Sequence, residues 1–514
     1  MSRPAAATVL GIDLGTRGVR AGLYTLDGTL LEGRERPVQT WHPRPGWAEQ
    51  SPPEVLAALH LAVSEVVAGH AAPVALSVAS TAVTAVAVDG ADCPAGRSLL
   101  WMDTRASAEA DEITRTGHPA LCYTGGQVSP EWMLPKALWL ARHDPGRFAA
   151  ARRIVDVHDW VIFQLTGRWS LAAATIAAEW CYDPLADGWS AELLDRFAIT
   201  GLLAGWDVPR LPAGHPAGRL TAAAAAQTGL VQGIPVVQGL MDSYAAALAA
   251  NLYEPGRLAI SIGTSSSYLA LAGRSVSDPR LLGPVPEAFG PGSIVQQGGQ
   301  TSAGAVVEWF SRQLAAGVPL PELDAEAAAI DPGADGLWAL DTWQGCRTPH
   351  RDAAARGMWG GLTLAHTRGH LFRAALEAVA FGGRTVLETL EEAGAVTREL
   401  AVTGGAARSD LWMQMHADVI GRPLVRLAAA QPVTLGAAIC AAVGAGAYPD
   451  LPAACAAMTS VRPGWLPDPG RRQAYEALYA GYRRRLTAVS ALNGRNLSTH
   501  EQGAAAQRAG QDSR

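Results

Sequence analysis

The chain has 514 residues, enough for two or three domains with extensive cores. Its net charge of −6, without a basic stripe, argues against a nucleic-acid-binding protein. No apolar run is long enough to span a bilayer, and the opening residues lack the pattern of a secretory signal. Its six cysteines show no CxxC spacing, which is typical of reduced thiols. We therefore expect a cytoplasmic protein that binds neither nucleic acid nor membrane.

The first strand pattern, at 9–16, ends in an acid followed by glycine and threonine. Asp13 is expected at the end of a buried strand, where a carboxylate is costly unless it meets a cation or a donor. The turn at Gly15 and Thr16 lets backbone N–H groups approach an anion closely. These three residues are predicted to form one wall of a nucleotide-phosphate site.

Strand patterns alternate with helix patterns in the first half, which predicts an α/β fold. Asp242 follows the strand pattern VVQGL, and a carboxylate there faces the ligand side of an α/β sheet. It fits a helix N-cap and the base of a phosphoryl transfer equally well. The other predicted elements are an extended piece over 29–38, a helix over 53–68, strands within 73–89, a strand over 99–105 and a helix over 156–167.

The stretch at 257–270 repeats the opening one. Ser261, Gly263 and Thr264 stand where the first copy has Asp13, Gly15 and Thr16. The repeat indicates a duplicated domain with a ligand between the copies, and two unrelated strand turns are the alternative. We expect domains over 1–252 and 253–490 and a disordered tail over 491–514. The second half is further predicted to hold a glycine turn and helix within 298–310, a long helix over 357–384, a strand, turn and helix over 402–417, and a small-residue helix over 434–446.

A third glycine turn, Gly404-Gly405, follows a strand pattern and opens a helix, whose N-terminus favours anions. The P-loop pattern is absent, because Lys136 is the only lysine and lies in PKALW. The dinucleotide fingerprint, the HExxH pattern and the GxSxG elbow are absent too. Three glycine turns split between two halves fit a nucleotide held in a cleft.

Together these motifs resemble the FGGY carbohydrate kinases, over about residues 9–486. The resemblance implies an α/β fold of two duplicated ribonuclease-H-like (actin-like ATPase) domains with a ligand cleft between them, and a reaction that uses ATP and Mg²⁺. The matching motifs are GIDLGT at 11–16, GWAEQ at 46–50, LLWMDTR at 99–105, PKALWL at 135–140, DWVIFQLTG at 159–167, GLMD at 239–242, ISIGTSS at 260–266, GGQTSAGAVVEW at 298–309, RTP at 347–349, the glycine turn and helix at 357–377, VTGGAARSDLW at 402–412 and TLGAAICA at 434–441.

The resemblance implies a role for each matching residue. Asp242 matches the catalytic base, which favours that role over the helix cap, and Asp13 matches the acid near Mg²⁺. Thr16 and Arg20 match the hydroxyl and the cation beside the phosphates, and Arg20 would supply a fixed positive charge. The other ATP-binding positions implied are Gly15, Gly263, Thr264, Gly304, Glu308, Gly405, Ala406 and Ser409.

The sugar is less closely defined. The loop at 80–83 lacks both the Gln-Met-His run of xylulose-type members and the Arg-Glu pair of glycerol-type members. The runs WMDTRA and SPEWMLPK look closest to the ribulokinase-like branch. Glu179 stands near a position where that branch often has a lysine, and Gln297 where it can have an acid. The implied substrate-binding residues are Thr81, Ala82, Asp103, Arg105, Glu179, Asp242 and Gln297, with a surface ion pair as the alternative for Asp103 and Arg105.

A ketopentose such as D-ribulose is the favoured substrate, with xylulose, a tetrulose or tetritol, or another polyol as alternatives. The expected partners are this sugar and ATP, and a homodimer is usual in the family. Two different classes of protein compete with this interpretation. An actin-like ATPase would share the phosphate turns without needing Asp242, and a regulator would bind both ligands without transfer.

Overall fold

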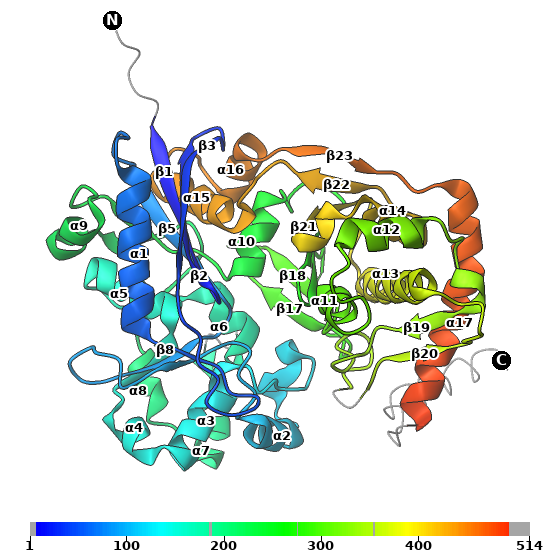
Figure 1. Cartoon of the computed structure of the whole chain (residues 1–514). Helices are drawn as coiled ribbons and strands as arrows, with labels where there is room; N and C mark the ends of the chain where they lie inside the picture. The colour runs from blue at the N-terminus through cyan, green and yellow to red at the C-terminus, as the bar shows by residue number, and fades with distance from the viewer. Residues whose placement is uncertain (1–6, 184–187, 275, 353–354, 493–514) are drawn as a thin grey trace, which may run out of the picture.

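The computed structural model describes residues 7–183, 188–274, 276–352 and 355–492. The described chain forms two lobes, each built on one large twisted sheet with helices beside it (Figure 1). Within these residues no helix is long and apolar enough to cross a membrane. The tail predicted to be disordered spans 491–514. Its residues after Leu492 lie outside the described part of the chain.

The first lobe contains a six-stranded sheet in the order β13-β14-β5-β1-β2-β3. The central strand β1 pairs antiparallel with β2 and parallel with β5. Both β1 and β5 are buried along almost their whole length, as their continuous apolar runs require. The strands are β1 (Thr8–Gly15), β2 (Gly18–Thr25), β3 (Leu30–Pro37), β5 (Ala75–Ser80), β13 (Pro216–Arg219) and β14 (Pro235–Val237).

The second lobe contains a seven-stranded sheet in the order β17-β18-β16-β15-β21-β22-β23. From β18 onward its pairings are antiparallel, antiparallel, parallel, parallel and antiparallel. The first sheet has the same succession from β3 to β13, so the predicted duplication is confirmed. The strands are β15 (Arg257–Ile262), β16 (Ser266–Leu271), β17 (Leu282–Pro286), β18 (Ile294–Gln300), β21 (Glu399–Thr403), β22 (Leu424–Leu427) and β23 (Val461–Trp465).

Helices pack beside both sheets, and several follow their sequence signals closely. Asp156 caps α5 (Val157–Thr166) by accepting from the His158 N–H, and Gly167 ends that helix at a φ of +67°. The other main helices are α1 (Pro52–Val67), α2 (Ser107–Arg115), α3 (Met133–His143), α4 (Pro145–Ala150), α6 (Ala173–Glu179), α7 (Ala191–Arg196), α8 (Leu202–Trp206), α9 (Ala222–Thr228), α11 (Gly304–Gln313), α12 (Leu320–Ala328), α13 (Arg368–Glu392), α14 (Asp410–Ile420), α16 (Leu451–Met458) and α17 (Pro469–Leu492).

Two helices of small residues join the lobes: α10 (Asp242–Ala249) and α15 (Pro432–Gly444). A Cβ on Gly436 would lie 1.9 Å from the Ala245 carbonyl oxygen, so the two backbones touch. A Cβ on Gly11 in β1 would lie 1.8 Å from the Thr434 oxygen. Because α15 belongs to the second half and packs on the first sheet, the boundary at 252/253 stays a prediction.

Two predicted elements are wrong. The strand over 99–105 is only β7 (Ser98–Leu99), because the Asp103 carboxylate accepts from the Arg105 N–H and closes a turn. The long helix begins at Arg368, since 358–360 form β20, which pairs with β19 (Trp338–Leu340). A capping box of Thr367 and His370 fixes that start.

A smaller sheet of the first lobe contains β4 (Glu49–Gln50), β6 (Ala85–Val88), β7 and β8 (Arg153–Asp156).

Candidate active site

An ion pair of a buried Asp13 and a half-buried Arg20 lies at the end of the first hairpin. Asp13 in β1 is the cross-strand partner of Arg20 in β2. The Arg20 Nη1 donates to Asp13 Oδ2 at 3.0 Å, and its Nη2 donates to Glu35 Oε1 at 3.1 Å. Asp13 is 2% exposed, and its Oδ1 has no hydrogen-bond partner among the described residues. Burial and the nearby Asp242 charge raise the pKa of Asp13 to about 7, against the opposing effect of Arg20.

Asp242 is the first residue of α10, directly after the end of the first sheet. Met241 occupies the N-cap position, so the expected alternative of Asp242 as the N-cap does not hold. The Asp242 carboxylate accepts only from the adjacent Ser243 N–H, at 2.6 Å, among the contacts of the described residues. Burial raises its pKa to about 6, while the Ser243 N–H and Arg20 act in the opposite direction. The two carboxylates and Arg20 therefore form one electrostatic unit.

Thr16 lies in the turn between β1 and β2, next to this unit. Its Oγ1 accepts from Trp101 Nε1 at 2.9 Å. Its carbonyl oxygen accepts from Gln50 Nε2 at 2.6 Å and from Thr40 Oγ1 at 3.1 Å. Sequence reasoning did not include Trp101 among the site residues, whereas it is half-buried and bonded to the phosphate turn. The signal that it missed is the indole N–H, which needs an acceptor when buried.

The second glycine turn lies against the start of α11. Gly304 donates its N–H to the Gly263 oxygen at 2.8 Å, and a Cβ on Gly304 would lie 2.4 Å from that oxygen. The Thr264 carbonyl oxygen accepts from the backbone N–H groups of Ala303 and Ala305, the residues on either side of Gly304. The third turn joins them, since Gly404 has a φ of +98° and its Cβ would lie 2.3 Å from the Ile262 oxygen. The parallel pairing of β15 with β21 brings these turns together.

The remaining predicted nucleotide residues lie around these turns with different exposure. Gly405 is exposed and Ala406 is buried, both in a short 3-10 segment after β21. The Ser409 hydroxyl caps α14 by accepting from the Trp412 N–H at 3.2 Å. Glu308 is exposed on α11 and faces Arg312 at 3.8 Å. Its contribution to a nucleotide site thus stays a prediction.

The predicted sugar loop is attached to β1. The Thr81 N–H donates to the Leu14 oxygen at 3.1 Å, and its hydroxyl pairs with Thr84 Oγ1 at 3.1 Å. Asp156 accepts from the Thr84 N–H at 3.0 Å, and burial raises the pKa of this carboxyl to about 7. Ala82 is half-buried and offers no polar side chain. The loop thus lies directly beside the phosphate turn.

Glu179 ends α6 on the first lobe, close to residues of the second. Burial raises its pKa to about 8, the Glu131 charge adds to this, and Lys136 and Arg347 oppose it. The Glu179 charge also raises the pKa of Tyr244, whose Oη is buried without a partner in the described part of the chain. Gln297 donates to Ser267 Oγ at 3.2 Å, while its Oε1 is likewise unpartnered there. These polar atoms are available to a hydroxylated ligand.

Asp103 and Arg105 form a buried pair, so the alternative of a surface ion pair is wrong. Asp103 is fully buried, and its Oδ2 accepts from the Ala48 N–H at 2.7 Å and from Arg105 Nη2 at 2.7 Å. Arg105 also donates to Glu49 Oε1 at 2.8 Å and lies over the Trp47 ring at 3.8 Å. With these partners, the pair fixes the loops before and after it.

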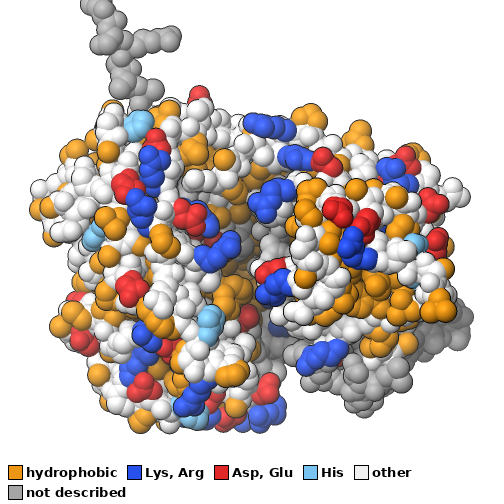
Figure 2. Space-filling view, in the orientation of Figure 1, with side chains coloured by type: hydrophobic (Ala, Val, Ile, Leu, Met, Phe, Trp, Pro, Cys, Tyr) orange, Lys and Arg blue, Asp and Glu red, His pale blue; other side chains and the backbone are white. Residues whose placement is uncertain are grey.

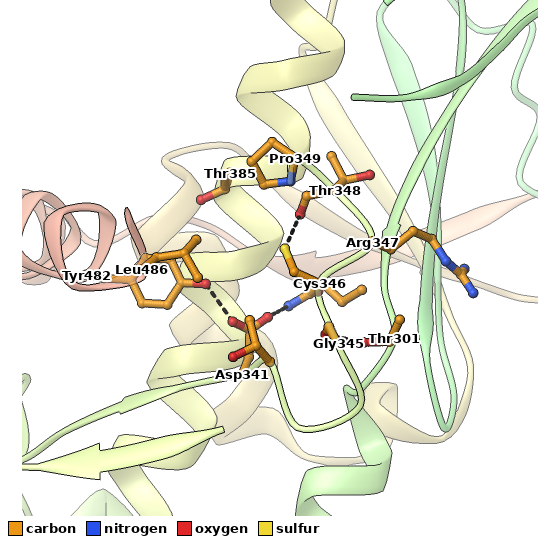
Figure 3. Close-up of a pocket in the computed structure, with 12 residues that line it drawn as sticks. Thr301, Asp341, Gly345, Cys346, Arg347, Thr348, Pro349, Thr385, Tyr482 and Leu486 are labelled. Atoms are coloured by element: carbon orange, nitrogen blue, oxygen red, sulfur yellow. Dashed lines mark hydrogen bonds between the residues drawn. The ribbon is translucent and has the colours of Figure 1, made fainter. Parts of the chain in front are cut away.

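A small polar cavity in the second lobe lies under the loop 341–349 (Figure 3). Tyr482 Oη donates to Asp341 Oδ1 at 2.5 Å, and Gln300 Nε2 donates to Asp341 Oδ2 at 2.7 Å. Arg347 is one of the residues that line the cavity, and its side chain extends away from Asp341 and Tyr482 (Figure 3). The cavity contains none of the predicted site residues, but its contacts fix the loop that carries Arg347.

The surface between the lobes is hollowed, with Lys or Arg side chains along its edge (Figure 2). Within the described residues, no group of three or more His, Cys, Asp or Glu could hold a metal ion. Mg²⁺ in phosphate-transfer sites uses one or two carboxylates together with waters and substrate oxygens. The unpartnered Oδ1 of Asp13 fits that requirement.

Comparison with known proteins agrees with this geometry. Models of the N-terminal and C-terminal domains of the FGGY family of carbohydrate kinases match residues 8–249 and 258–445. A ribulokinase from Mycolicibacterium smegmatis is 34% identical over 92% of both chains. A glycerol kinase from Alkalilimnicola ehrlichii is 31% identical over 88% of this chain and 94% of its own. A xylulose kinase structure from Rhodospirillum rubrum superposes with a TM-score of 0.85 at 30% identity, over 95% of this chain and all of its own.

These relatives are named as kinases of different substrates, so they define the type of reaction without defining the substrate. The two matched domains cover most of the chain, and the sheet duplication agrees with the fold of the structural relatives. The chain is a phosphotransferase that acts on a sugar, and it belongs to the FGGY family of carbohydrate kinases.

Proposed function

We propose that the protein transfers the γ-phosphoryl group of ATP to a primary hydroxyl of a ketopentose such as D-ribulose, in the cytoplasm. The observation that supports this most directly is the unit of Asp242, Asp13 and Arg20. Asp242 has a pKa raised to about 6, so it is a carboxylate at neutral pH yet basic enough to accept a proton. A kinase that transfers to a hydroxyl needs such a base.

In the proposed reaction, Asp242 accepts the hydroxyl proton as the sugar oxygen forms its bond to the γ-phosphorus. The bond from that phosphorus to the β,γ-bridging oxygen breaks, and ADP leaves. Arg20 and the Thr16 turn offer donors to the transferred group, where negative charge is redistributed. Mg²⁺, held beside Asp13, would supply further positive charge to the phosphates. The turns at Gly263 and Gly404 are proposed to hold the rest of the nucleotide.

The sugar is proposed to lie between the loop at Thr81 and the second lobe. Ala82 gives no hydrogen bond and leaves space, which suits a chain longer than glycerol. The half-buried carboxyl group of Glu179, which its raised pKa keeps largely protonated at neutral pH, can donate to or accept from the sugar hydroxyls beyond the reacting one. The unpartnered Oε1 of Gln297 can accept from them. Xylulose and shorter or reduced polyols are the competing substrates, because xylulose and glycerol kinases are also among the relatives.

The test is ADP release from ATP and Mg²⁺ with D- and L-ribulose, D- and L-xylulose, ribitol, erythritol, erythrulose and glycerol. We expect one ketopentose to have the highest kcat/KM, and little ADP release without sugar. A higher value for glycerol or a four-carbon polyol would contradict the ketopentose assignment. Equal ADP release with and without every sugar would contradict the kinase and favour the actin-like ATPase alternative.

A further inference from the structure

Thr16 is held from three sides by residues that the proposed mechanism does not use. An indole N–H can only donate, so in the 2.9 Å contact with Trp101 the Thr16 Oγ1 is the acceptor. The Thr16 carbonyl oxygen is already occupied by Gln50 and Thr40. The proton of the Thr16 hydroxyl therefore points away from both Trp101 and the Thr16 carbonyl oxygen. No other hydrogen bond of this hydroxyl is present among the described residues.

We propose that Trp101 is a positioning residue that commits the Thr16 hydroxyl to act as a donor toward the phosphoryl group being transferred. This inference rests on the proposed function. A free threonine hydroxyl can rotate and can accept or donate. With one lone pair engaged by an N–H, the hydroxyl hydrogen is directed away from Trp101 and is available to an anion. A donor fixed in advance costs no reorganisation when charge develops on the phosphoryl oxygens.

The segment that carries Trp101 is itself anchored. Lys136, which is fully buried, donates from Nζ to the Leu100 oxygen at 2.7 Å and to the Val83 oxygen at 2.7 Å. Asp103, two residues after Trp101, accepts from the Ala48 N–H. One ammonium group thus holds both the backbone before Trp101 and the proposed sugar loop. The position of the Thr16 hydroxyl is consequently linked to the part of the first lobe that would bind sugar.

The test is the variant Trp101→Phe, which keeps an aromatic ring and removes the N–H. We expect kcat/KM for ATP to fall about tenfold, as for the loss of one hydrogen bond in the transition state. The KM for the sugar should change less than about twofold, because the ring remains. The matched control is Trp169→Phe, since Trp169 is also half-buried and donates from Nε1 to Asp92 at 3.0 Å. It should retain wild-type kinetics.

A double-mutant cycle separates this role from a structural one. Thr16→Val removes the hydroxyl at nearly constant volume and should lower kcat/KM for ATP at least as much as Trp101→Phe. In the Thr16→Val background, Trp101→Phe should have almost no further effect, because the hydroxyl that it positions is gone. Additive losses would overturn the inference.

Wild-type activity in Thr16→Val would overturn it as well, even if Trp101→Phe folded poorly. Failure of the proposed function is distinguishable, because it would appear as a wild-type protein without sugar-dependent ADP release. A wild-type protein that phosphorylates a sugar, with an additive cycle, refutes the positioning role alone.

Discussion

Asp242→Asn is the substitution that tests the proposed chemistry most directly. The amide has almost the same shape, and its oxygen can still accept from the Ser243 N–H, the one hydrogen bond that the carboxylate makes among the described residues. Stability should therefore change little, and the loss should fall on proton transfer. General-base catalysis contributes about 10²–10⁴-fold, so kcat with the preferred sugar should fall by that factor, or about 3–5 kcal/mol in the barrier. The matched control is Asp144→Asn, which keeps an N-cap on α4.

The pH dependence of the reaction gives a second, independent check. Asp242 acts as a base only when deprotonated, and its pKa is raised from 3.8 to about 6. Wild-type kcat/KM should therefore be constant above about pH 7 and fall about tenfold between pH 7 and pH 5. In Asp242→Asn the residual activity should lose the pH dependence that comes from Asp242, because an amide does not titrate in this range. The pKa of Asp13 should fall only in part, since burial is the largest cause that raises it.

The assay is coupled ADP release over pH 5–8, with denaturant unfolding of each variant as the stability check. Activity of Asp242→Asn within threefold of wild type would refute the assignment of the base. An unchanged decline in activity at low pH in that variant would refute Asp242 as the group that titrates.

Three further substitutions test the surrounding structure. Arg20→Lys should lower kcat about 10- to 100-fold, since an ammonium cannot reproduce the fork shared between Asp13 and Glu35, and wild-type kinetics would contradict this. Gly436→Ala should lower the free energy of unfolding by about 1–3 kcal/mol in urea titrations, because its Cβ would overlap a carbonyl of α10, whereas Gly146→Ala, with open space around its Cβ, should be neutral. Lys136→Met should cost about 2–5 kcal/mol, because two buried carbonyls lose their donor, and equal stability would show that water replaces the ammonium.

The duplicated α/β fold could be predicted from the sequence, because a strand pattern followed by glycine and threonine occurs at 9–16 and again at 257–264. The small residues of α10 and α15 permit the close approach of these helices, but the pairing of the two was not predicted. The turn within 99–105 could not be predicted from the sequence. Its apolar residues resemble a strand, whereas a buried pair of Asp103 and Arg105 folds the segment into a turn. A contact from a distant residue holds this turn as well, since the Ala48 N–H donates to Asp103, and composition contains no signal for such contacts.

In the candidate site, too, the sequence predicts some features and not others. The glycine turn at Gly404 and Gly405 could be predicted from a local pattern, a strand followed by two glycines, and Gly404 leaves no space for a Cβ. The hydrogen-bond partners of the polar side chains could not be predicted, because they come from distant parts of the chain. Trp101 and Thr16 are 85 residues apart and share a hydrogen bond that no spacing rule indicates. The family resemblance implied roles for single residues, whereas the hydrogen bonds between them are seen only in the three-dimensional structure.

Helix α10 links the proposed catalytic base to the contact between the two halves of the chain. Its first residue, Asp242, lies with Asp13 and Arg20, and its body packs on α15 in the apolar cluster that both halves share. The position of the base is therefore set by the contact between α10 and α15 and not by a flexible loop. Two backbones in direct contact, at Gly436 and Ala245, leave little freedom for independent motion. Hence we expect substitutions that separate α10 from α15 to lower kcat through the position of Asp242, even where the protein remains folded.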